Sequence, residues 1–327
     1  MEGAAMLRLP TIIAIATTLS CGGAAGPLAS DDTPLAGGFR WRLVTSAADW
    51  PPQRRLSHTF SYEGQIWLLD PLAGYWRTED GSDWNPFSPT LPAQAFRHEI
   101  LQFGGRLVGL RGDLPTDELW GSTDGETWTK IADGPPRTSG SRSAVVFQNR
   151  LWIFQADRIE EPLVWTTGDG TKWTQGATPP WGRRGDATFV VHDDRLWVIG
   201  GRRSVDGNPD QLVEMNDTWV TRDGVTWEHR EWDLDWPGRL YYGVEAWEGR
   251  LWLLGGGEGG SNGQRNDVWT STDGAHWELF DAEAPWRARF AMSVVVHGDK
   301  MFLFGGKEGS EQFFNDVWSL ERVEDSN

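Results

Sequence analysis

The stretch WGSTDGETW, residues 120–128, sets two tryptophans eight positions apart around an Asp–Gly step. The same pattern, Trp–x–x–x–Asp–Gly–x–x–Trp, occurs five times at intervals of about 44 to 54 residues. A repeat of about 40 to 50 residues is typical of β-propeller blades, in which each copy folds into one small sheet. The five tryptophan pairs are Trp76/Trp84, Trp120/Trp128, Trp165/Trp173, Trp219/Trp227 and Trp269/Trp277.

The fourth copy of the repeat shows how one blade divides into four strands. The apolar runs 187–191 and 196–199 predict the inner and second strands, which are joined by a hairpin turn. A polar loop follows, residues 218–221 predict the third strand, and Trp227 begins the fourth. The glycine of the Asp223-Gly224 step predicts a tight turn, because glycine adopts positive φ without steric cost.

Six copies of the second strand imply six blades. They span residues 66–69, 107–110, 151–154, 196–199, 251–254 and 301–304. The sixth copy stops after Trp318 without an Asp–Gly turn, whereas residues 39–44 have the pattern of a strand that no copy uses. We therefore expect an all-β fold, a six-bladed propeller of four-stranded blades whose ring is closed by the N-terminal strand. Closure removes the open sheet edges that would otherwise favour aggregation.

The repeat resembles the Kelch repeat, which has an arginine before the inner strand, Gly–Gly after the second strand and aromatics around the last turn. The diglycine is present at Gly200-Gly201, Gly255-Gly256 and Gly305-Gly306. The arginine is present at Arg54, Arg184, Arg239 and Arg289. The resemblance covers about residues 39–323, is closest in blades 4 to 6, and implies the fold of the galactose-oxidase central domain.

The turn STDGETW, residues 122–128, also resembles the Asp-box of sialidase-like propellers, although it is one residue shorter. We interpret these turns as structural, because an aspartate side chain can accept hydrogen bonds from the backbone of its own turn.

The formal net charge is −17, from 47 acidic and 30 basic residues. Nucleic acids and anionic lipid headgroups both require a positive surface, so this charge argues against either as a partner. It leaves basic partners and cations open. We expect a monomer.

The N-terminal residues have the features of export and lipid attachment. Arg8 and the apolar run 11–19 precede Cys21, which is the only cysteine. This order describes a secretory signal, and residues 18–21 resemble a bacterial lipobox in which Thr18 replaces the usual aliphatic residue. The resemblance implies cleavage before Cys21 and lipidation of its thiol; a plain signal peptide is the alternative.

The chain therefore divides into a signal peptide (1–20), a flexible tether (21–38) and the propeller (39–327). We expect an exported protein of the bacterial cell envelope that contacts the membrane only through its lipid. The outer membrane is favoured where two membranes are present.

A tryptophan precedes the arginine in four blades that are contiguous in a closed ring. The pairs are Trp50/Arg54, Trp181/Arg184, Trp236/Arg239 and Trp286/Arg289. Indole rings and guanidinium groups suit stacking on sugars and binding of carboxylates, so these eight residues are the candidate ligand-binding residues. The alternative is that they pack adjacent blades. Blades 4 to 6 also have long second-to-third-strand loops on the expected ligand face, at 202–216, 257–266 and 307–315.

No catalytic set and no metal site stands out, and we expect no cofactor. Galactose-oxidase chemistry needs a Cys–Tyr cofactor, which the position of Cys21 excludes. Residues 206–210 partly match a calcium loop, but Gln211 stands where that loop requires glycine. Part of a sialidase site is imitated by Tyr241, Tyr242, Glu245, Arg239 and Arg289.

The leading hypothesis is a non-catalytic binding module for a protein or a glycan. Two alternatives stay open. One is a carbohydrate-active propeller enzyme, similar to sialidases or to the six-bladed Kelch sialic-acid mutarotases, which are also bacterial and exported. The other is a structural protein of the envelope.

Overall fold

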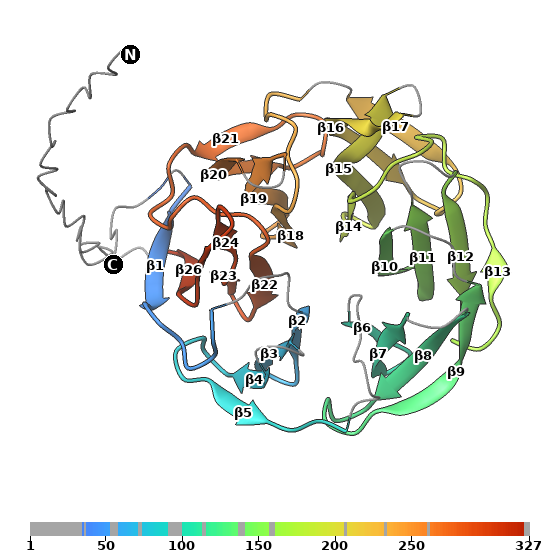
Figure 1. The fold of residues 1–327 in the computed structure, drawn as a ribbon, viewed down its shortest axis with the longest axis horizontal. Coiled ribbons are helices and arrows are strands. Elements are labelled where there is room, and N and C mark those ends of the chain that lie inside the picture. Colours follow the sequence, from blue (N-terminus) through green and yellow to red (C-terminus); the bar gives the residue numbers. More distant parts are fainter. Residues whose placement is uncertain are drawn as a thin grey trace, which may run out of the picture.

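The computed structural model describes residues 35, 37–52, 58–70, 74–90, 100–112, 116–136, 141–156, 161–205, 208–231, 234–259 and 262–323. Cys21, Arg54 and the first two residues of the candidate calcium loop lie outside them. Every regular element in the described ranges is a β-strand. Six four-stranded antiparallel sheets form a ring, which confirms the predicted six-bladed propeller (Figure 1).

Blades 1 to 3 follow one another along the chain, each running from its inner to its outer strand. Blade 1 comprises β2 (His58–Tyr62), β3 (Gln65–Asp70), β4 (Gly74–Thr78) and β5 (Asn85–Phe87). Blade 2 comprises β6 (Ile100–Phe103), β7 (Arg106–Arg111), β8 (Thr116–Ser122) and β9 (Thr129–Pro136). Blade 3 comprises β10 (Ser141–Phe147), β11 (Arg150–Ala156), β12 (Leu163–Thr167) and β13 (Thr174–Gln175).

Blades 4 to 6 have longer central strands or an added hairpin. Blade 4 comprises β14 (Thr188–His192), β15 (Arg195–Val205), β16 (Asn208–Thr221) and β17 (Trp227–Glu231). Blade 5 comprises β18 (Gly243–Trp247), β19 (Arg250–Glu258), β20 (Asn262–Ser271) and β21 (Glu278–Asp281). Blade 6 comprises β22 (Ser293–His297), β23 (Lys300–Phe304), β26 (Val317–Arg322) and β1 (Phe39–Thr45), with the small hairpin β24 (Lys307–Glu308) and β25 (Gln312–Phe313).

The N-terminal strand closes the ring, as the sequence predicts. β1 pairs antiparallel with β26, with Trp41 opposite Leu320 and Leu43 opposite Trp318. The first and last strands of the propeller therefore share one sheet, and blade 6 has its fourth strand on the perimeter like the other blades (Figure 1).

The core lies between neighbouring blades and is built mainly from the second strands. In blade 5 the second strand supplies Leu251, Trp252, Leu253 and Leu254, all of them 0% exposed. Leu251 and Leu253 pack toward blade 4, whereas Trp252 and Leu254 pack toward blade 6. A strand buried on both faces has to be apolar at every position, which explains why the second strands are continuous apolar runs.

The Asp–Gly turns join each blade to the preceding one. The carboxylate of Asp124 accepts hydrogen bonds from the backbone N–H groups of Glu126 (2.9 Å) and Thr127 (2.7 Å), and these bonds lower the pKa of Asp124 to about 2. Gly125 has a φ of +74°, and a Cβ at that position would lie 2.9 Å from the Trp67 ring of blade 1. The glycine is therefore required twice, by its backbone conformation and by the neighbouring indole.

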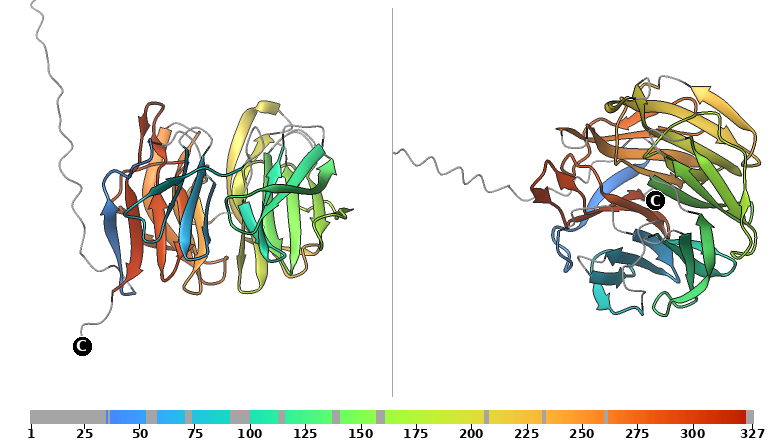
Figure 2. Two further views of the ribbon diagram at one scale, coloured as in Figure 1. Left: turned by 90° about the horizontal axis from the view of Figure 1, so that it is seen from below. Right: turned by 45° about the vertical axis from the view of Figure 1, so that its right-hand side comes forward.

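The connections predicted as long loops in blades 4 and 5 are extensions of the strands themselves. β15 and β16 stay paired out to Val205 and Asn208, and β19 and β20 out to Glu258 and Asn262. Blade 6 forms the β24–β25 hairpin at the same place. The side view shows the yellow hairpin of blade 4 and the red hairpin of blade 6 rising on one face of the ring (Figure 2).

The contact between the turn glycine and the preceding blade can be tested within blade 5. Gly274 and Gly249 have nearly equal φ angles, +67° and +69°, but a Cβ at Gly274 would overlap the ring of Trp197, whereas the space around Gly249 is open. Both alanine substitutions cost about 1 kcal/mol in backbone strain. We expect Gly274→Ala to lose about 1 to 3 kcal/mol more of unfolding free energy, from overpacking. Urea denaturation measures the difference, and equal losses in the two variants would contradict the packing role.

Candidate functional site

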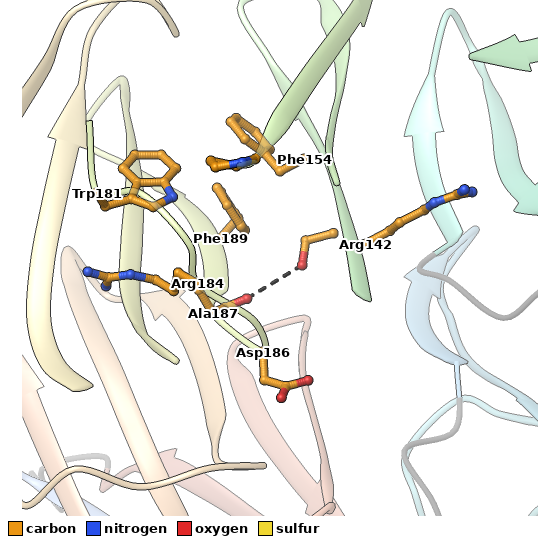
Figure 3. Close-up of a pocket in the computed structure, with 9 residues that line it drawn as sticks. Arg142, Phe154, Trp181, Arg184, Asp186, Ala187 and Phe189 are labelled. Atoms are coloured by element: carbon orange, nitrogen blue, oxygen red, sulfur yellow. Dashed lines mark hydrogen bonds between the residues drawn. The ribbon is translucent and has the colours of Figure 1, made fainter. Parts of the chain in front are cut away.

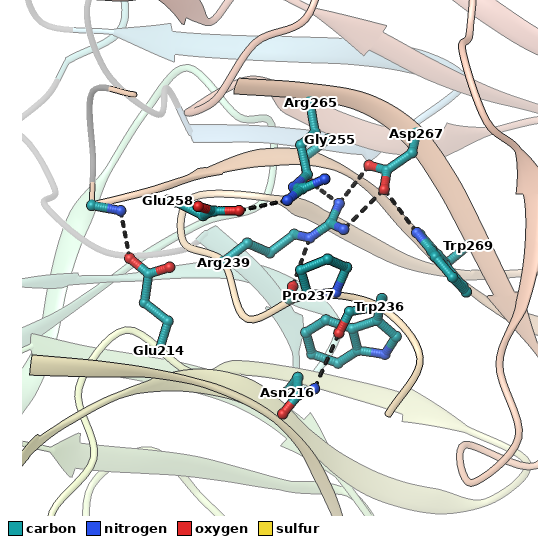
Figure 4. Close-up of polar contacts among 11 residues, drawn as sticks. Glu214, Asn216, Trp236, Pro237, Arg239, Gly255, Glu258, Arg265, Asp267 and Trp269 are labelled. Atoms are coloured by element: carbon teal, nitrogen blue, oxygen red, sulfur yellow. Dashed lines mark hydrogen bonds and ion pairs between the residues drawn. The ribbon is translucent and has the colours of Figure 1, made fainter. Parts of the chain in front are cut away.

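The arginines of the predicted ligand face form buried ion pairs. Arg239 Nη1 and Nη2 donate to Asp267 Oδ1 (2.5 Å) and Oδ2 (2.9 Å), and Nη1 also donates to the carbonyl oxygen of Gly255 (3.0 Å) (Figure 4). The same arrangement joins Arg184 to Asp217 and Arg289 to Asp316. A guanidinium group that donates to both carboxylate oxygens is held in one orientation.

A tryptophan on the third strand completes each of these pairs. The indole N–H of Trp269 donates to Asp267 Oδ2 at 2.9 Å, and Trp219 and Trp318 bond Asp217 and Asp316 in the same way. Burial alone would raise the pKa of Asp267, but the hydrogen bonds and positive charge of Arg239 outweigh burial and hold that pKa below its ordinary value. The aspartate is therefore ionised at neutral pH, and the charges of the pair balance.

The tryptophans that precede the arginines are buried in the interfaces between neighbouring blades. Trp50 and Trp286 are 1% exposed and Trp236 is 0% exposed. Their rings meet a tryptophan of an outer strand or outer turn edge to face, for example Trp236 against Trp277 with centroids 6.1 Å apart. An asparagine fixes the backbone on either side, as Asn216 Nδ2 does by donating to the carbonyl oxygens of Leu234 (2.9 Å) and Trp236 (3.2 Å).

The buried positions of these arginines and tryptophans are the ones expected if the residues pack adjacent blades together. Arg239 and Arg289 are 0% exposed and Arg184 is 3% exposed, so their guanidinium groups have no surface to offer a ligand. The contacts of these side chains lie inside the protein, and a ligand on this face would meet their neighbours. Arg54 lies outside the described residues.

Trp181 keeps partial exposure and lines a hollow between blades 3 and 4, together with Arg184, Phe154 and Phe189 (Figure 3). The hollow has a cavity volume of about 10 Å³, which is room for a single water molecule. A sugar ring or a peptide side chain does not fit there.

The feature that the sequence analysis missed is the acidic partner. An aspartate stands two residues before the third-strand tryptophan in blades 4, 5 and 6, at Asp217, Asp267 and Asp316. Those are the blades that also carry both the arginine and the diglycine. A co-occurring acid and base at fixed repeat positions indicate an internal ion pair more directly than a ligand site.

The linkers that enter blades 4 to 6 are hydrogen-bonded to the hairpin extensions. Gly185 pairs with Arg202, Leu240 with Gly257 and Phe290 with Lys307. In blade 5, Leu240 N donates to Gly257 O at 2.9 Å and Gly257 N donates to Leu240 O at 3.1 Å. The second glycine of the diglycine permits this approach, because a Cβ on Gly256 would lie 2.9 Å from the carbonyl oxygen of Leu240.

Side chains add further contacts on this surface, which we call the hairpin rim: residues 202–205, 208–214, 257–259, 262–265 and 307–313. Glu214 accepts a hydrogen bond from Gly259 N at 2.6 Å, which joins the hairpins of blades 4 and 5 (Figure 4). Arg202 pairs with Asp186 of the preceding linker at 2.7 Å. Arg203 and Val213 face solvent opposite each other across the blade 4 hairpin, and Val213 is 43% exposed.

A carboxyl group stands alone near the centre of the ring. Glu245 is the middle residue of the inner strand β18, opposite Trp252, and it remains partly exposed. The corresponding inner-strand residues of the other five blades are Phe60, Leu101, Val145, Val190 and Val295. No hydrogen bond or ion pair of Glu245 is found among the described residues. Burial raises the pKa of Glu245 from the ordinary 4.5 to about 8, so the group is mostly protonated at neutral pH.

The residues that imitate a sialidase site do not form one. Arg239 and Arg289 are committed to their aspartates, and the buried hydroxyl of Tyr242 donates to the carbonyl oxygen of Ile199 at 2.8 Å. Glu214 and Asp217, the acidic residues that follow the candidate calcium loop 206–210, are likewise bonded to Gly259 and Arg184. In the described part of the chain, no three His, Cys, Asp or Glu side chains are grouped to hold a metal ion.

Within the described residues there is also no helix of the length and apolar character needed to span a membrane.

Comparison with known proteins identifies the fold but no family. No family model and no curated protein matches the chain. A solved structure titled "Structure of YjhT" superimposes with a TM-score of 0.63 at 12% sequence identity, over 87% of this chain and 98% of that chain. The superposition shows that the two chains share the propeller fold. Because the sequence identity is so low, the activity of this chain has to be argued from its own residues.

The raised pKa of Glu245 predicts a pH-dependent effect on stability. Because the folded protein binds this proton more tightly than the unfolded chain does, the contribution of Glu245 to stability is complete below about pH 4.5 and falls as the pH rises to about 8. Glu245→Gln does not ionise, so its advantage in unfolding free energy over the wild type should grow across that range by up to about 5 kcal/mol. Urea denaturation at several pH values measures it. Glu283→Gln, which removes an exposed carboxylate of the linker that follows blade 5, should show no such trend, and a constant difference for Glu245→Gln would contradict the raised pKa.

Proposed function

We propose that the protein is an exported, lipid-anchored Kelch-type propeller that acts as a non-catalytic binding module for a protein or a glycan. The observation that carries this proposal is the hairpin rim. Three consecutive blades extend their second-to-third-strand connections into hydrogen-bonded hairpins, and each hairpin is tied to the linker beside it.

The construction of the hairpin rim suits binding because its backbone is already ordered. Ordering a loop when a ligand binds lowers affinity, and hairpins held by ladder and linker hydrogen bonds avoid most of that cost. The buried ion pairs of Arg184, Arg239 and Arg289 lie directly beneath the rim and fix the base of each hairpin through the diglycine carbonyl. Binding residues are commonly placed on connections that a rigid scaffold positions.

The exposed side chains of the rim are of mixed chemistry. Arg203 supplies a cation, Val213 an apolar surface and Glu258 an acidic group paired with Arg265. A surface that combines charge with an accessible apolar residue fits a protein or the polar and apolar faces of a sugar. It does not fit nucleic acid, which requires a predominantly basic surface.

The Kelch assignment is supported by the geometry of blades 4 to 6. The arginine, the diglycine and the paired aromatics of the repeat meet in one network, in which the arginine bonds the first glycine and an indole bonds the aspartate. The arginine, the first glycine and the third-strand tryptophan of the repeat thus all take part in the hydrogen-bond network at the base of the hairpin.

A carbohydrate-active enzyme is the second candidate, and Glu245 is the observation that favours it. A carboxyl group with a pKa of about 8 can donate a proton at neutral pH, as the general acids of glycosidases do. Turnover of aryl glycosides or interconversion of sugar anomers that is lost in Glu245→Gln would support this candidate over the binding module.

The role of the hairpin rim can be tested with two exposed valines. Val213 lies on the blade 4 hairpin, and Val225, 55% exposed, lies in the Asp–Gly turn at the other end of the same blade. We expect Val213→Asp to weaken binding at least tenfold, because it places a charge at the contact surface. Val225→Asp changes charge and polarity equally and should leave affinity unchanged. Ligands from a glycan array or from crosslinking on intact cells provide the binding assay, and equal affinities of the two variants would place the contact elsewhere.

The lipid anchor is tested at Cys21. Cys21→Ser removes the thiol that would carry the lipid, so the exported protein should move from the membrane fraction to the soluble fraction. Membrane fractionation with metabolic labelling by a fatty acid measures this. A wild type that takes up no label and is already in the soluble fraction would leave only the plain signal peptide, and a variant that stays in the membrane fraction would show that the lipid is not what holds the protein there.

A further inference from the structure

A hollow in the outer part of blade 4 is lined by three arginines. It has a cavity volume of about 260 Å³ and lies at the Asp–Gly turn, at the opposite end of β16 from the hairpin rim. Arg195 comes from the start of β15, Arg222 from the turn after β16, and Arg230 from β17 on the perimeter (Figure 1). Because one molecule of liquid water takes up ~30 Å³, a small organic molecule has room in this hollow.

Two of these arginines face each other across the sheet. Leu196 pairs with Thr221, so the next step along the same register places Arg195 opposite Arg222. Side chains that are directly opposite on antiparallel strands share one face of the sheet, and like charges in such a pair are destabilising. An anion between the two guanidinium groups would remove that repulsion.

The carboxylates that line the hollow do not supply this anion. Asp223 belongs to its own turn, where Oδ1 accepts hydrogen bonds from the N–H groups of Val225 (2.8 Å) and Thr226 (2.7 Å). Glu228 is exposed and comes no closer than 3.8 Å to Arg230 Nη1. The guanidinium groups therefore have donors left for a ligand.

The facing arginines are also poorly neutralised from outside the hollow. Arg195 Nη2 lies 3.5 Å from an oxygen of Asp193, which is an exposed residue of the preceding turn. Arg222 is exposed, and no ion pair or side-chain hydrogen bond of Arg222 is found among the described residues. A long contact with an exposed carboxylate contributes little, so the positive charge of this pair stays available.

Blade 6 has a carboxylate at the position where blade 4 has Arg222. Its second strand begins with Lys300, and the ladder places Glu321 opposite, one step beyond the pair of Met301 with Leu320. The Glu321 carboxylate lies 2.9 Å from Lys300 Nζ and 2.9 Å from Arg40 Nη2 of the outer strand β1. An anion at this place can thus bridge a cation of the second strand and a cation of the outer strand.

Arginine at two of the three positions is particular to blade 4. Arg222 follows the third-strand tryptophan by three residues, and Arg230 follows the tryptophan of the next turn by three. The residues that correspond to Arg222 in blades 1, 2, 3, 5 and 6 are Glu79, Thr123, Gly168, Thr272 and Glu321, and those that correspond to Arg230 in blades 1, 2, 3 and 5 are Phe87, Ile131, Gly176 and Phe280. The other blades form without either arginine, so the scaffold does not account for them.

We propose that this hollow binds a small phosphorylated molecule through its phosphate monoester group. The phosphate oxygens take the place that the Glu321 carboxylate has in blade 6 and accept hydrogen bonds from Arg195, Arg222 and Arg230. A phosphate monoester has three acceptor oxygens and a charge of about −1.5 to −2 at pH 7, which suits several guanidinium groups better than a single carboxylate does. The rest of the hollow holds the body of the molecule.

The overall charge of the protein favours a single phosphate group over a polymer. The net charge of −17 repels an extended polyanion such as nucleic acid, whereas a small ligand meets only the local positive charge of the hollow. The site is separate from the hairpin rim and does not depend on the function proposed for it.

Isothermal titration calorimetry of the full-length chain at pH 7.5 and constant ionic strength tests the proposal. Inorganic phosphate and glucose 6-phosphate should bind with one site per chain, and glucose should not bind. Dimethyl phosphate and methyl sulfate carry a single negative charge and should bind at least tenfold more weakly than inorganic phosphate. Equal binding of the singly and doubly charged probes, or no binding of either phosphate, overturns the proposal.

Variants of the facing arginines assign the site. Arg195→Gln combined with Arg222→Gln should lower the affinity for glucose 6-phosphate at least tenfold, because two charged donors are lost. Arg250→Gln removes the arginine at the start of the second strand of blade 5 and should bind as the wild type does. Wild-type affinity in the double variant, or an equal loss in Arg250→Gln, overturns the proposal.

Arg222→Glu provides a second measurement should the double variant fail to fold. It places a carboxylate opposite Arg195, as Glu321 stands opposite Lys300 in blade 6, so the fold should be kept and phosphate binding lost. Inorganic phosphate should then raise the Tm of the wild type but not that of Arg222→Glu. An equal rise of Tm in both proteins overturns the proposal.

Discussion

Antiparallel pairing of β1 with β26 is the contact on which the other blade interfaces depend, because it converts a row of six sheets into a ring. The closing segment carries more than its backbone hydrogen bonds. Trp41 packs edge to face on Trp286, at the junction of blades 5 and 6, and Trp50 packs on Trp84 of blade 1. Asn315 of blade 6 donates to the carbonyl oxygens of Ala48 and Trp50 and fixes the path between them. One stretch of chain thus joins three blades, and blade 6 is completed as a four-stranded sheet like the others.

The two halves of the ring are held by different interactions. In blades 4 to 6 a buried arginine, an aspartate and an indole form the same network three times, with the diglycine allowing the linker to approach the hairpin. Blades 1 to 3 lack the full set. Blade 2 carries Glu118 at the position of the aspartate, where it accepts hydrogen bonds from Arg111, Lys130 and Trp120, and Arg142 of blade 3 is paired with Asp117 of blade 2. The regular networks and the extended hairpins therefore coincide in the same three blades, so the hairpin rim stands on the half of the ring that has the repeated buried ion pairs.

Glu245 on the inner strand β18 differs from the arginines beneath the rim in whether its charge is balanced within the protein. The arginine pairs neutralise themselves and stabilise the scaffold, so their burial calls for no ligand. Glu245 has no such partner among the described residues, and its position is apolar in every other blade. A carboxyl group kept in this setting lowers stability at neutral pH, which distinguishes it from the residues that only build the fold.

Periodicity alone determined the architecture of this protein. The eight-residue tryptophan spacing reflects the geometry of a turn, and the six apolar second strands reflect burial on both faces. The extra strand at residues 39–44 reflects an edge that needs a partner. Each of these signals lies within a short run of consecutive residues, so the sequence alone reveals it. Only the tertiary structure decided what the recurring tryptophan and arginine positions of the repeat do. Trp236 and Arg239 have the composition of a sugar site, but they are buried because Trp277 and Asp267, some 30 to 40 residues away, close over them. Glu245 gained its significance in the same way, since the register of β18 against β19 aligns it with five apolar residues that lie far apart in the chain. Burial and register depend on which segments become neighbours, and that is a property of the folded ring.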